Sequence, residues 1–399
     1  MDSRRKFIGT MASGLATTLA SSSVLGASER IRVGMIGAGA RGIELMRWAS
    51  ACSNVEVSAI ADIYSKNLED TRRLVAGAQT YADYRYLLDD KSIDAVVIAT
   101  PPHLHAEHFV HALEAGKHVY QERTMAFTVA DAKRMRAAYR KAPRLTVQIG
   151  HQACSSGQMS DALHFLAGEQ VGKVTGIHMR WFRNTPRGRP VWSRPVYPAM
   201  TAENIAWNSF LGAAPRCEFD ANRFLNWRLF ADYSGGSVHE NMSQQLAFWY
   251  RALNLQIPAA VTMSGGVYLW KDGRELPDTM SVSLEQSEEM LITWDSGFGN
   301  NQLGVTEDVL GTDGTISRGQ SIRYTPQKVN RPDGVELLGR NITAPNEHMR
   351  NFIDSIRSGR ETACPPDLGY RVSVACRMAL ESYRLGRTVR WDSAREEMV

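Results

Sequence analysis

Short apolar runs alternate with amphipathic segments through the first third of the chain. Residues 31–36 (IRVGMI), 55–62 (VEVSAIAD) and 94–100 (DAVVIAT) are apolar enough to form strands that are buried on both faces. Residues 105–116 carry apolar positions at helical spacing and end on a glycine, and the strand-like run 117–122 follows. This alternation predicts an α/β fold with a doubly wound parallel sheet, whose ligand crevice lies at the carboxyl ends of the strands.

The later part of the chain has a different pattern. Strand-like runs rich in β-branched and aromatic residues follow one another at residues 174–182, 259–270, 279–285, 290–298 and 321–327. Turn pairs such as Asp272-Gly273 and Asp313-Gly314 separate some of them. Two amphipathic helices that close on glycine are predicted over residues 346–359 and 370–386. With 399 residues, 43% of them hydrophobic, the chain is long enough for two domains.

A glycine-rich turn follows the first predicted strand. Gly37, Gly39 and Gly42 fit the spacing G-x-G-x-x-G in the segment GAGARG, in which Ala40 and Arg41 separate the last two glycines. Between a strand and a helix, this spacing is typical of a turn that binds a dinucleotide pyrophosphate at the helix N-terminus. We therefore expect these five residues to contact a nucleotide cofactor.

An acidic residue ends the second predicted strand. Asp62 follows Gly42 by 20 residues. A carboxylate there accepts hydrogen bonds from both ribose hydroxyls and repels a 2′-phosphate, which favours NAD over NADP, although Lys66 would offset part of that repulsion. Four residues at the carboxyl ends of two later strands are also expected at the cofactor: Thr100, Pro101, His105 and Glu122.

These motifs resemble the Gfo/Idh/MocA family of oxidoreductases, which includes glucose-fructose oxidoreductase and inositol dehydrogenases. The resemblance extends through VQIGHQ, GKVTGIHMRWFRN, WNSFLG, NWRLFADYSGGSVHEN and HMRNFIDSIRSG, so it covers nearly all of the chain after residue 30. It implies a Rossmann domain over residues 30–150 and an α/β substrate and oligomerisation domain with a large, mostly antiparallel sheet over residues 151–345. It further implies C-terminal helices over residues 346–399 that pack back toward the nucleotide domain, and a homo-oligomer.

The family resemblance also locates a catalytic centre, and this chain departs from it. Family members carry Glu-Lys-Pro after the fifth strand and an Asp-x-x-x-His pair at a helix start, and the lysine and histidine exchange the substrate proton. Here Arg123 and Thr124 follow Glu122, and Glu240 and Gln244 stand at the aspartate and histidine positions. Arginine stays protonated and glutamine cannot take up a proton, so Arg123, Glu240 and Gln244 are expected at the reacting centre without the usual base.

Other residues offer a replacement proton acceptor. Glu240 and Gln244 are four residues apart and are expected to share one helix face, with His239 beside them. We rank Glu240 and His239 above His151, and Tyr233 is a further candidate. For each histidine, a packed or surface imidazole is the alternative.

Aromatic and polar residues typical of carbohydrate binding surround these positions. Aromatic rings stack on sugar C–H groups, while Arg and Asn hydrogen-bond hydroxyls. The cluster comprises Arg183, Asn184, Trp192, Arg194, Tyr197, Trp207, Trp227 and Arg228. From this cluster and the segment GHQ we expect substrate contacts from His151, Arg183, Asn184, Trp227 and Arg228, although Trp207 and Trp227 could equally belong to the core.

The N-terminus resembles a twin-arginine signal peptide over residues 1–27. Arg4 and Arg5 precede Phe7 and a weakly apolar run rich in Ala, Ser and Thr, which is not suited to a permanent membrane span. The motif predicts recognition by the twin-arginine export machinery and a periplasmic or otherwise exported protein.

Charge and cysteine content exclude several other classes. Loss of residues 1–27 would lower the formal net charge from +4 to +2, because it removes Arg4, Arg5, Lys6 and Asp2. So small a surplus gives no reason to expect nucleic-acid binding. The five cysteines are dispersed and lack metal-binding spacing, so we expect core thiols, with neither a zinc site nor a disulfide framework.

Three functions remain open. The first is an exported oxidoreductase that acts on a sugar or glycoside with tightly bound NAD. The second is a glycosidase resembling the family 109 glycoside hydrolases, in which transient sugar oxidation permits elimination and Tyr233 or His239 is the base. The third is a binding protein that keeps the fold and the nucleotide but lost catalysis through the changes at Arg123 and Gln244.

Overall fold

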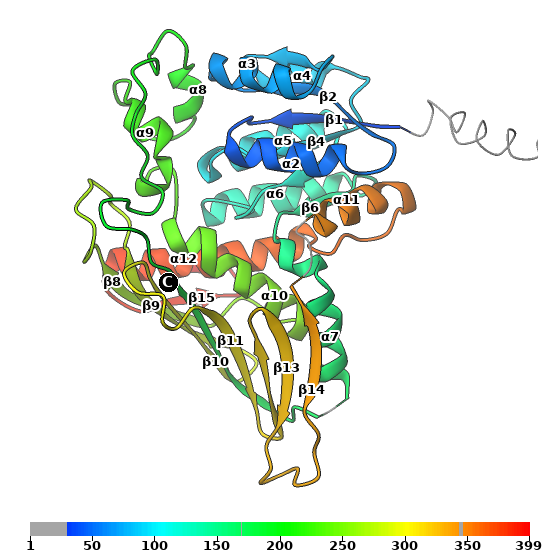
Figure 1. Cartoon of the computed structure of the whole chain (residues 1–399), viewed down its shortest axis with the longest axis vertical. Helices are drawn as coiled ribbons and strands as arrows, with labels where there is room; N and C mark the ends of the chain where they lie inside the picture. Colours follow the sequence, from blue (N-terminus) through cyan, green and yellow to red (C-terminus); the bar gives the residue numbers. More distant parts are fainter. Residues whose placement is uncertain (1–29, 169, 343–345) are drawn as a thin grey trace, which may run out of the picture.

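The computed structural model describes residues 30–168, 170–342 and 346–399 (Figure 1). The predicted signal peptide lies outside the described residues. Within them, Figure 1 shows two layers of sheet, with the blue and cyan nucleotide domain above and the curved yellow and orange sheet below. No helix of the described part is both long and apolar enough to cross a membrane.

The first sheet has six strands in the order β3-β2-β1-β4-β5-β6, all parallel. Its strands are β1 (Ile31–Ile36), β2 (Val55–Ala61), β3 (Gln79–Tyr81), β4 (Ala95–Ile98), β5 (His118–Gln121) and β6 (Val147–Ile149). Its helices are α2 (Ala40–Ser50), α3 (Ser65–Leu74), α4 (Tyr84–Asp89), η2 (Pro102–Leu104), α5 (His105–Glu114) and α6 (Val129–Lys141). The strand order reverses between β1 and β4, which places the ligand crevice at the carboxyl ends of these strands.

Helices cover both faces of this sheet. On one face, Leu45 of α2 packs with Val33 of β1. On the other, Phe109 of α5 and Met135 of α6 pack with Val96 of β4. The strands are buried on both sides, as their continuous apolar runs predict.

The second sheet has ten strands in the order β14-β13-β12-β11-β7-β10-β9-β8-β15-β16. All neighbours are antiparallel except β7 and β10, which run parallel. The strands are β7 (Val174–Phe182), β8 (Ala260–Gly266), β9 (Thr279–Gln286), β10 (Met290–Gly297), β11 (Val305–Gly311), β12 (Gly314–Arg318), β13 (Ser321–Pro326), β14 (Leu337–Asn341), β15 (Val389–Asp392) and β16 (Glu397–Met398). The predicted fold class, a Rossmann domain followed by an α/β domain with a large, mostly antiparallel sheet, is confirmed.

Burial alternates along the strands of the second sheet. In β9, Met280, Val282 and Leu284 are buried, whereas the residues between them face outward. One face of the sheet is therefore covered, and α10 and α12 supply the cover. The remaining helices are η3 (Gln152–Ser155), α7 (Gly157–Ala167), α8 (Trp207–Leu211), α9 (Ala221–Leu225), η4 (Trp227–Leu229), η5 (Val238–Met242), α10 (Ser243–Leu253), α11 (Glu347–Ser358) and α12 (Pro366–Leu385).

The two C-terminal helices contact elements of the nucleotide domain. Phe352 of α11 packs in the same apolar cluster as Leu45 of α2. Helix α12 packs against both α6 and β8 and so lies between the two sheets. It begins at Pro366, four residues before the predicted start at Tyr370, because proline is well tolerated in the first turn of a helix.

A long segment between β7 and η5 reaches across to the nucleotide domain; we call residues 183–235 the clasp. Figure 1 shows its helices α8 and α9 standing beside α3 rather than beside the second sheet. Ile205 forms a β-bridge with Tyr64, and the amide of Ala206 donates to the carbonyl of Ile63 at 2.9 Å. The Nε2 atom of His103 lies 2.7 Å from the carbonyl of Phe210. The clasp is thus tied to the chain that follows β2 and to η2.

Candidate active site

One cavity of about 1220 Å³ lies between the nucleotide domain and the clasp. The glycine turn and Asp62 line one end, and Trp192, Trp227 and Glu240 belong to the other. Ligand pockets are commonly about 300–1,000 Å³, so this cavity has room for a dinucleotide together with a small substrate.

The glycine turn fits a dinucleotide. Gly37 has a φ of +92°, which favours glycine. A Cβ added to Gly42 would lie 2.0 Å from the carbonyl oxygen of Gly37, so α2 can approach β1 this closely only with glycine there. A Cβ added to Gly39 would meet nothing within 4 Å. Gly39 therefore leaves open space at the N-terminus of α2, where a pyrophosphate can be cradled.

Asp62 lies in the cavity at the end of β2. Its carboxylate accepts hydrogen bonds from the amides of Ala38 at 2.6 Å and Tyr64 at 2.8 Å, and from Nδ2 of Asn67 at 3.1 Å. Burial raises the pKa of Asp62, and these three hydrogen bonds oppose the increase. A carboxylate has about four acceptor positions, so capacity remains for a ribose hydroxyl.

Lys66 also lines the cavity, but its ammonium group forms an ion pair with Asp70 one helical turn later. Its charge is therefore compensated within α3. This pairing weakens the offset that Lys66 could provide against repulsion between Asp62 and a 2′-phosphate.

The residues at the end of β4 divide into two groups. Thr100 and Pro101 line the cavity. His105 does not, because its ring is buried between the two strand ends: Nδ1 lies 2.7 Å from the carbonyl of Thr124 and Nε2 lies 2.8 Å from that of Thr100. His105 was expected at the cofactor. In the structure its ring instead connects the segment after β4 with the segment after β5.

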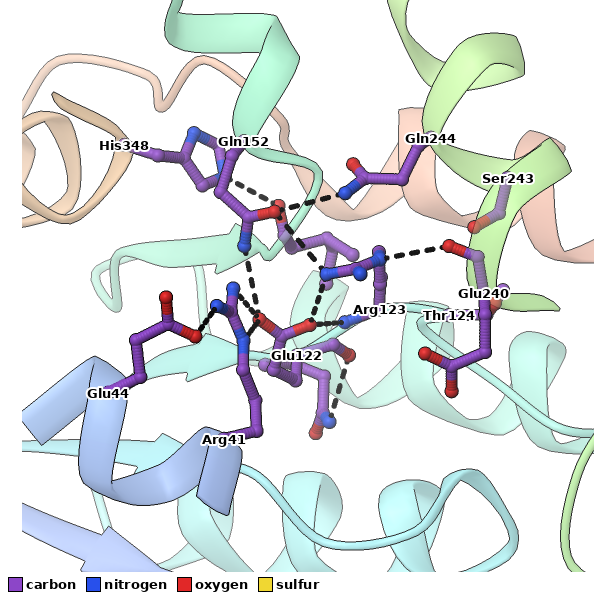
Figure 2. A network of polar contacts seen from close by, with 12 residues as sticks. Arg41, Glu44, Glu122, Arg123, Thr124, Gln152, Glu240, Ser243, Gln244 and His348 are labelled. Carbon is purple, nitrogen blue, oxygen red and sulfur yellow. Dashed lines mark hydrogen bonds and ion pairs between the residues drawn. The ribbon is translucent and has the colours of Figure 1, made fainter. Parts of the chain in front are cut away.

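Glu122 is the centre of a buried ionic network (Figure 2). Its carboxylate accepts from Nε of Arg41 at 2.7 Å, from the backbone amide of Arg123 at 2.8 Å and from Nε2 of Gln152 at 3.1 Å. Its side chain is only 6% exposed. Burial alone would raise the pKa of Glu122, but the charges of Arg41 and Arg123 and their hydrogen bonds lower it to about 2.

Arg123 is held within the same network. Its Nη1 lies 3.2 Å from the Glu122 carboxylate and 3.3 Å from Oε1 of Gln152, and its Nε donates to the carbonyl of Glu240 at 3.3 Å. Gln244 donates to the same Gln152 oxygen at 3.2 Å. Gln152 therefore joins the two positions at which arginine and glutamine replace the lysine and histidine of the resembled family. Neither Arg123 nor Gln244 lines the cavity, contrary to the expectation that both lie at the reacting centre.

Glu240 is different, because it lines the cavity. Its side chain is 12% exposed, and Oε1 lies 3.1 Å from Nε of Arg228, whose guanidinium stacks over Trp227 at 4.1 Å. Figure 2 shows the Glu240 carboxylate and the Gln244 amide on opposite sides of Arg123. The expected shared helix face is wrong, because Val238–Met242 is a π-helical turn, which breaks the α-helical i,i+4 register.

The other proposed proton acceptors are buried outside the cavity. The rings of His151 and His239 are fully buried, and burial lowers the pKa of each to about 3. Tyr233 packs in an aromatic cluster, 4.9 Å from the ring of Phe210 and 5.0 Å from that of His103, and burial raises its pKa. These three residues were expected to offer a proton acceptor near the substrate. None of them lines the cavity.

The predicted substrate residues also divide. Trp227 and Arg228 line the cavity. Arg183 and Asn184 follow β7 outside the lining, where Arg183 lies over the ring of Trp181 and Asn184 pairs with Gly299. Trp207 stacks on Phe210, with ring centroids 5.1 Å apart, in the packed base of the clasp.

Some functional features could not be read from the sequence motifs. Gln152, the first residue of η3, connects the side chains of Glu122, Arg123 and Gln244, and its only signal was its place in VQIGHQ, a segment within the family resemblance. Arg216 of the clasp lines the cavity and belongs to no motif. The pairing of Arg41 with Glu122 joins residues 81 positions apart.

Most of the described cysteines are buried. Within the described residues no group of His, Cys, Asp and Glu is placed to hold a metal ion. Cys154, Cys364 and Cys376 are buried thiols, as expected of core residues, whereas Cys217 is exposed.

Known proteins match the chain at two levels. The family model "Oxidoreductase family, NAD-binding Rossmann fold" (GFO_IDH_MocA) matches residues 31–151. The uncharacterized oxidoreductase YrbE of Bacillus subtilis is 32% identical over 371 residues, which cover 91% of this chain and 97% of that protein. Inositol 2-dehydrogenase of Salmonella typhimurium is 30% identical over 154 residues, so the matched part spans about half of that enzyme, 46% of its length, and 38% of this chain.

Solved structures share the fold. Levoglucosan dehydrogenase in complex with NADH and levoglucosan superposes with a TM-score of 0.70 at 16% identity, covering 90% of this chain and 99% of that one. Aldose-aldose oxidoreductase of Caulobacter crescentus gives 0.67 at 19% identity, with the same coverage. With an oxidoreductase that matches over nearly its whole length, this chain belongs to the Gfo/Idh/MocA family of NAD(P)-binding oxidoreductases.

Proposed function

We propose that this protein oxidises a hydroxyl group of a sugar or related polyol by hydride transfer to a tightly held NAD. The observation that carries the proposal is the single cavity that joins the glycine turn and Asp62 to an aromatic end containing Glu240. A cofactor and a carbohydrate bound there would lie side by side.

The cofactor end favours NAD. Gly37, Gly39 and Asp62 would hold the pyrophosphate and the ribose, and Thr100 and Pro101 would contact the cofactor beyond them. Asp62 would repel a 2′-phosphate, and Lys66 is already paired with Asp70. When bound, NAD supplies the acceptor for the hydride that leaves the hydroxyl-bearing carbon, which becomes a carbonyl carbon.

Glu240 is the residue to which we assign the hydroxyl proton. A general base must reach the proton it removes, and Glu240 is the proposed acceptor that lines the cavity. Arg228 holds this carboxylate in place from the side of Trp227. Arg123 contacts the backbone of Glu240 from behind, so we assign it a role in positioning the π-helical turn rather than in proton transfer.

The clasp supports tight retention of the cofactor. It crosses from the second domain to Ile63 and Tyr64, directly after Asp62, and to His103. These contacts hold the clasp beside Asp62, where we propose that it slows the release of a bound dinucleotide. A retained NAD must be reoxidised in place, so we infer that a second carbonyl compound takes the hydride back.

The two alternative functions have less support. The glycosidase hypothesis needs Tyr233 or His239 as a base, and both are buried outside the cavity. The binding-protein hypothesis draws on Arg123 and Gln244, but neither residue lines the cavity, so their replacement is weaker support for a loss of catalysis.

The test uses purified full-length protein with its endogenous nucleotide. The bound nucleotide is extracted and identified by chromatography, and the absorbance of reduced nicotinamide is followed while inositols, aldoses, an anhydrosugar and aryl glycosides are added singly. Reduction without bond cleavage supports the proposal. Cleavage without net reduction would establish the glycosidase, and nucleotide that stays oxidised across the panel would establish the binding protein.

We also propose that the protein is exported after folding with its cofactor. Support comes from the paired Arg4 and Arg5 and from a clasp able to retain a nucleotide. Replacement of both by lysine should leave the precursor in the cytoplasm, whereas Lys6→Arg should not. Equal export of both variants, measured by cell fractionation, would contradict this assignment.

Self-association is a further proposal. The outward face of the second sheet includes exposed Leu291 beside polar residues such as Ser283 and Thr293. A homo-oligomer would pair this face between subunits. Light scattering should give a mass above 44.4 kDa that falls when Leu291 is replaced by glutamate; an unchanged mass would exclude this face.

A further inference from the structure

We infer that the substrate is an anionic sugar, such as a uronate, whose carboxylate is bound by Arg194 of the clasp. The inference rests on the proposed function, because it names the class of carbohydrate that the same cavity takes. It comes from the distribution of charge over the cavity wall.

The clasp wall of the cavity is positively charged. Among the described residues that line the cavity, those of the clasp include three arginines and no acidic residue: Arg194, Arg216 and Arg228. Arg228 is paired with Glu240. The guanidinium groups of Arg194 and Arg216 have no ion pair within the described residues. Two arginines that form no ion pair within the described residues therefore line the cavity.

The backbone of Arg194 is fixed at the Glu240 end of the cavity. Its amide donates to Oδ1 of Asn226 at 2.9 Å, and Nδ2 of Asn226 donates back to its carbonyl at 2.9 Å. Asn226 is only 2% exposed and directly precedes Trp227 and Arg228. Arg194 is consequently anchored to the same segment that positions the ion pair of Glu240.

The cationic side chains that line the nucleotide side of the cavity, unlike Arg194, form ion pairs with carboxylates. Arg41 is bound by Glu44 and Glu122, and Lys66 is bound by Asp70. Arg85 is bound by Asp83 and Glu107. The cofactor pyrophosphate has the N-terminus of α2 as its site, so it does not require the clasp arginines.

The aromatic residues around Arg194 suit a pyranose ring. Trp192, Tyr197 and Trp227 line the same wall. Trp192 has a φ of +64°, a conformation that bulky residues rarely adopt and that persists only where the surrounding structure holds it. Ring stacking combined with a guanidinium matches a sugar that carries a carboxylate, because arginine binds that group through two parallel hydrogen bonds.

The test compares sugars that differ only at one carbon. Isothermal titration of the purified, nucleotide-containing protein is carried out with the pairs glucose and glucuronate, galactose and galacturonate, and mannose and mannuronate. At least one uronate should bind roughly tenfold or more tightly than its neutral partner, and added salt should weaken this preference. Equal affinities within all three pairs, or no binding by any of them, would overturn the inference.

Two variants assign the preference to the residue. Arg194→Gln should remove the preference for the uronate without changing the affinity for the neutral sugar or the content of bound nucleotide. The matched control is Arg187→Gln, because Arg187 is an exposed clasp arginine outside the cavity lining. Loss of nucleotide from Arg194→Gln would mean that the arginine serves the cofactor, which also overturns the inference.

These readouts separate the inference from the proposed function. Binding of a uronate that depends on Arg194, without reduction of the nicotinamide, would contradict hydride transfer and leave the anion site standing. Reduction of the nicotinamide by neutral sugars alone would support hydride transfer and contradict the anion site.

Discussion

The two carboxylates at the heart of this molecule lie in contrasting surroundings. Glu122 is surrounded by Arg41, Arg123 and Gln152, and its pKa is lowered to about 2. Among the described residues, Glu240 has one ion pair, with Arg228, and it lines the cavity. A carboxylate that stays ionised to about pH 2 is a structural anion, whereas one exposed to substrate can exchange a proton. Glu122 therefore belongs to the buried framework and Glu240 to the surface of the cavity, although Arg123 contacts both residues.

The largest expected effect concerns the glycine turn that serves the reactive surface. Gly42→Ala places a methyl group against the Gly37 carbonyl, so α2 must move and bound nucleotide should be lost completely. Gly39→Ala meets no protein atom within 4 Å, so the fold should keep its thermal stability while nucleotide binding weakens because the methyl group enters the pyrophosphate space. Nucleotide content and melting temperature of both variants check this pair. Full nucleotide retention in Gly39→Ala would place the pyrophosphate elsewhere.

The buried network should respond through stability rather than through binding. Glu122→Gln leaves Arg41 and Arg123 without their shared counter-ion in a buried site, which should cost about 3 kcal/mol in the free energy of unfolding. Urea denaturation measures the change. The control is Glu44→Gln, which removes a half-exposed partner of Arg41 and should cost less than about 1 kcal/mol. A similar decrease in the free energy of unfolding in both variants would contradict the structural role assigned to Glu122.

Acid should lower the free energy of unfolding over two overlapping pH ranges. The buried His151 and His239 have pKa values of about 3 against an ordinary 6.5, so stability should fall as the pH drops from about 6.5 toward 3. Glu122 has a lowered pKa, so its contribution is complete above about pH 4.5 and is lost between that pH and about 2. Unfolding free energies measured against pH should show both slopes in the wild type. In Glu122→Gln only the step below pH 4.5 should shrink; a smaller histidine step would contradict the assignment.

The smallest effect is expected at the two positions where the family pattern is broken. Arg123→Lys and Gln244→His, alone and together, restore the usual residues, but neither position lines the cavity. The rate of nicotinamide reduction should therefore change by less than about tenfold, the scale of one lost or gained neutral hydrogen bond. Stopped-flow absorbance measures it. A gain of 100-fold or more in the double variant would return these residues to the reacting centre.

The sequence predicts the cofactor end of the site better than the substrate end. Gly37, Gly42 and Asp62 act through local backbone geometry, so their spacing along the chain is sufficient evidence. The orientation of Glu240 depends on a π-helical turn, which no i,i+4 pattern reveals. The position of Arg194 depends on a pair of hydrogen bonds to Asn226, 32 residues later in the chain.

Burial explains the remaining differences from expectation. His239 and Tyr233 are adjacent to functional segments in the sequence, yet their rings pack into the core. Sequence position alone does not show which way a side chain points when the local backbone departs from regular helix. The sequence likewise predicted the strands of the second sheet, including β7 and β9, but not that the clasp between β7 and η5 crosses to the nucleotide domain.

The central claim is that Glu240, and not the network around Glu122, takes the substrate proton. Single-turnover reduction of the bound nicotinamide by a reactive sugar, measured for the wild type and for Glu240→Gln, tests it most directly. Removal of a general base should slow the step by about 10²–10⁴-fold while nucleotide content and sugar affinity stay the same. A Glu240→Gln variant that reduces its nicotinamide at the wild-type rate would contradict the account.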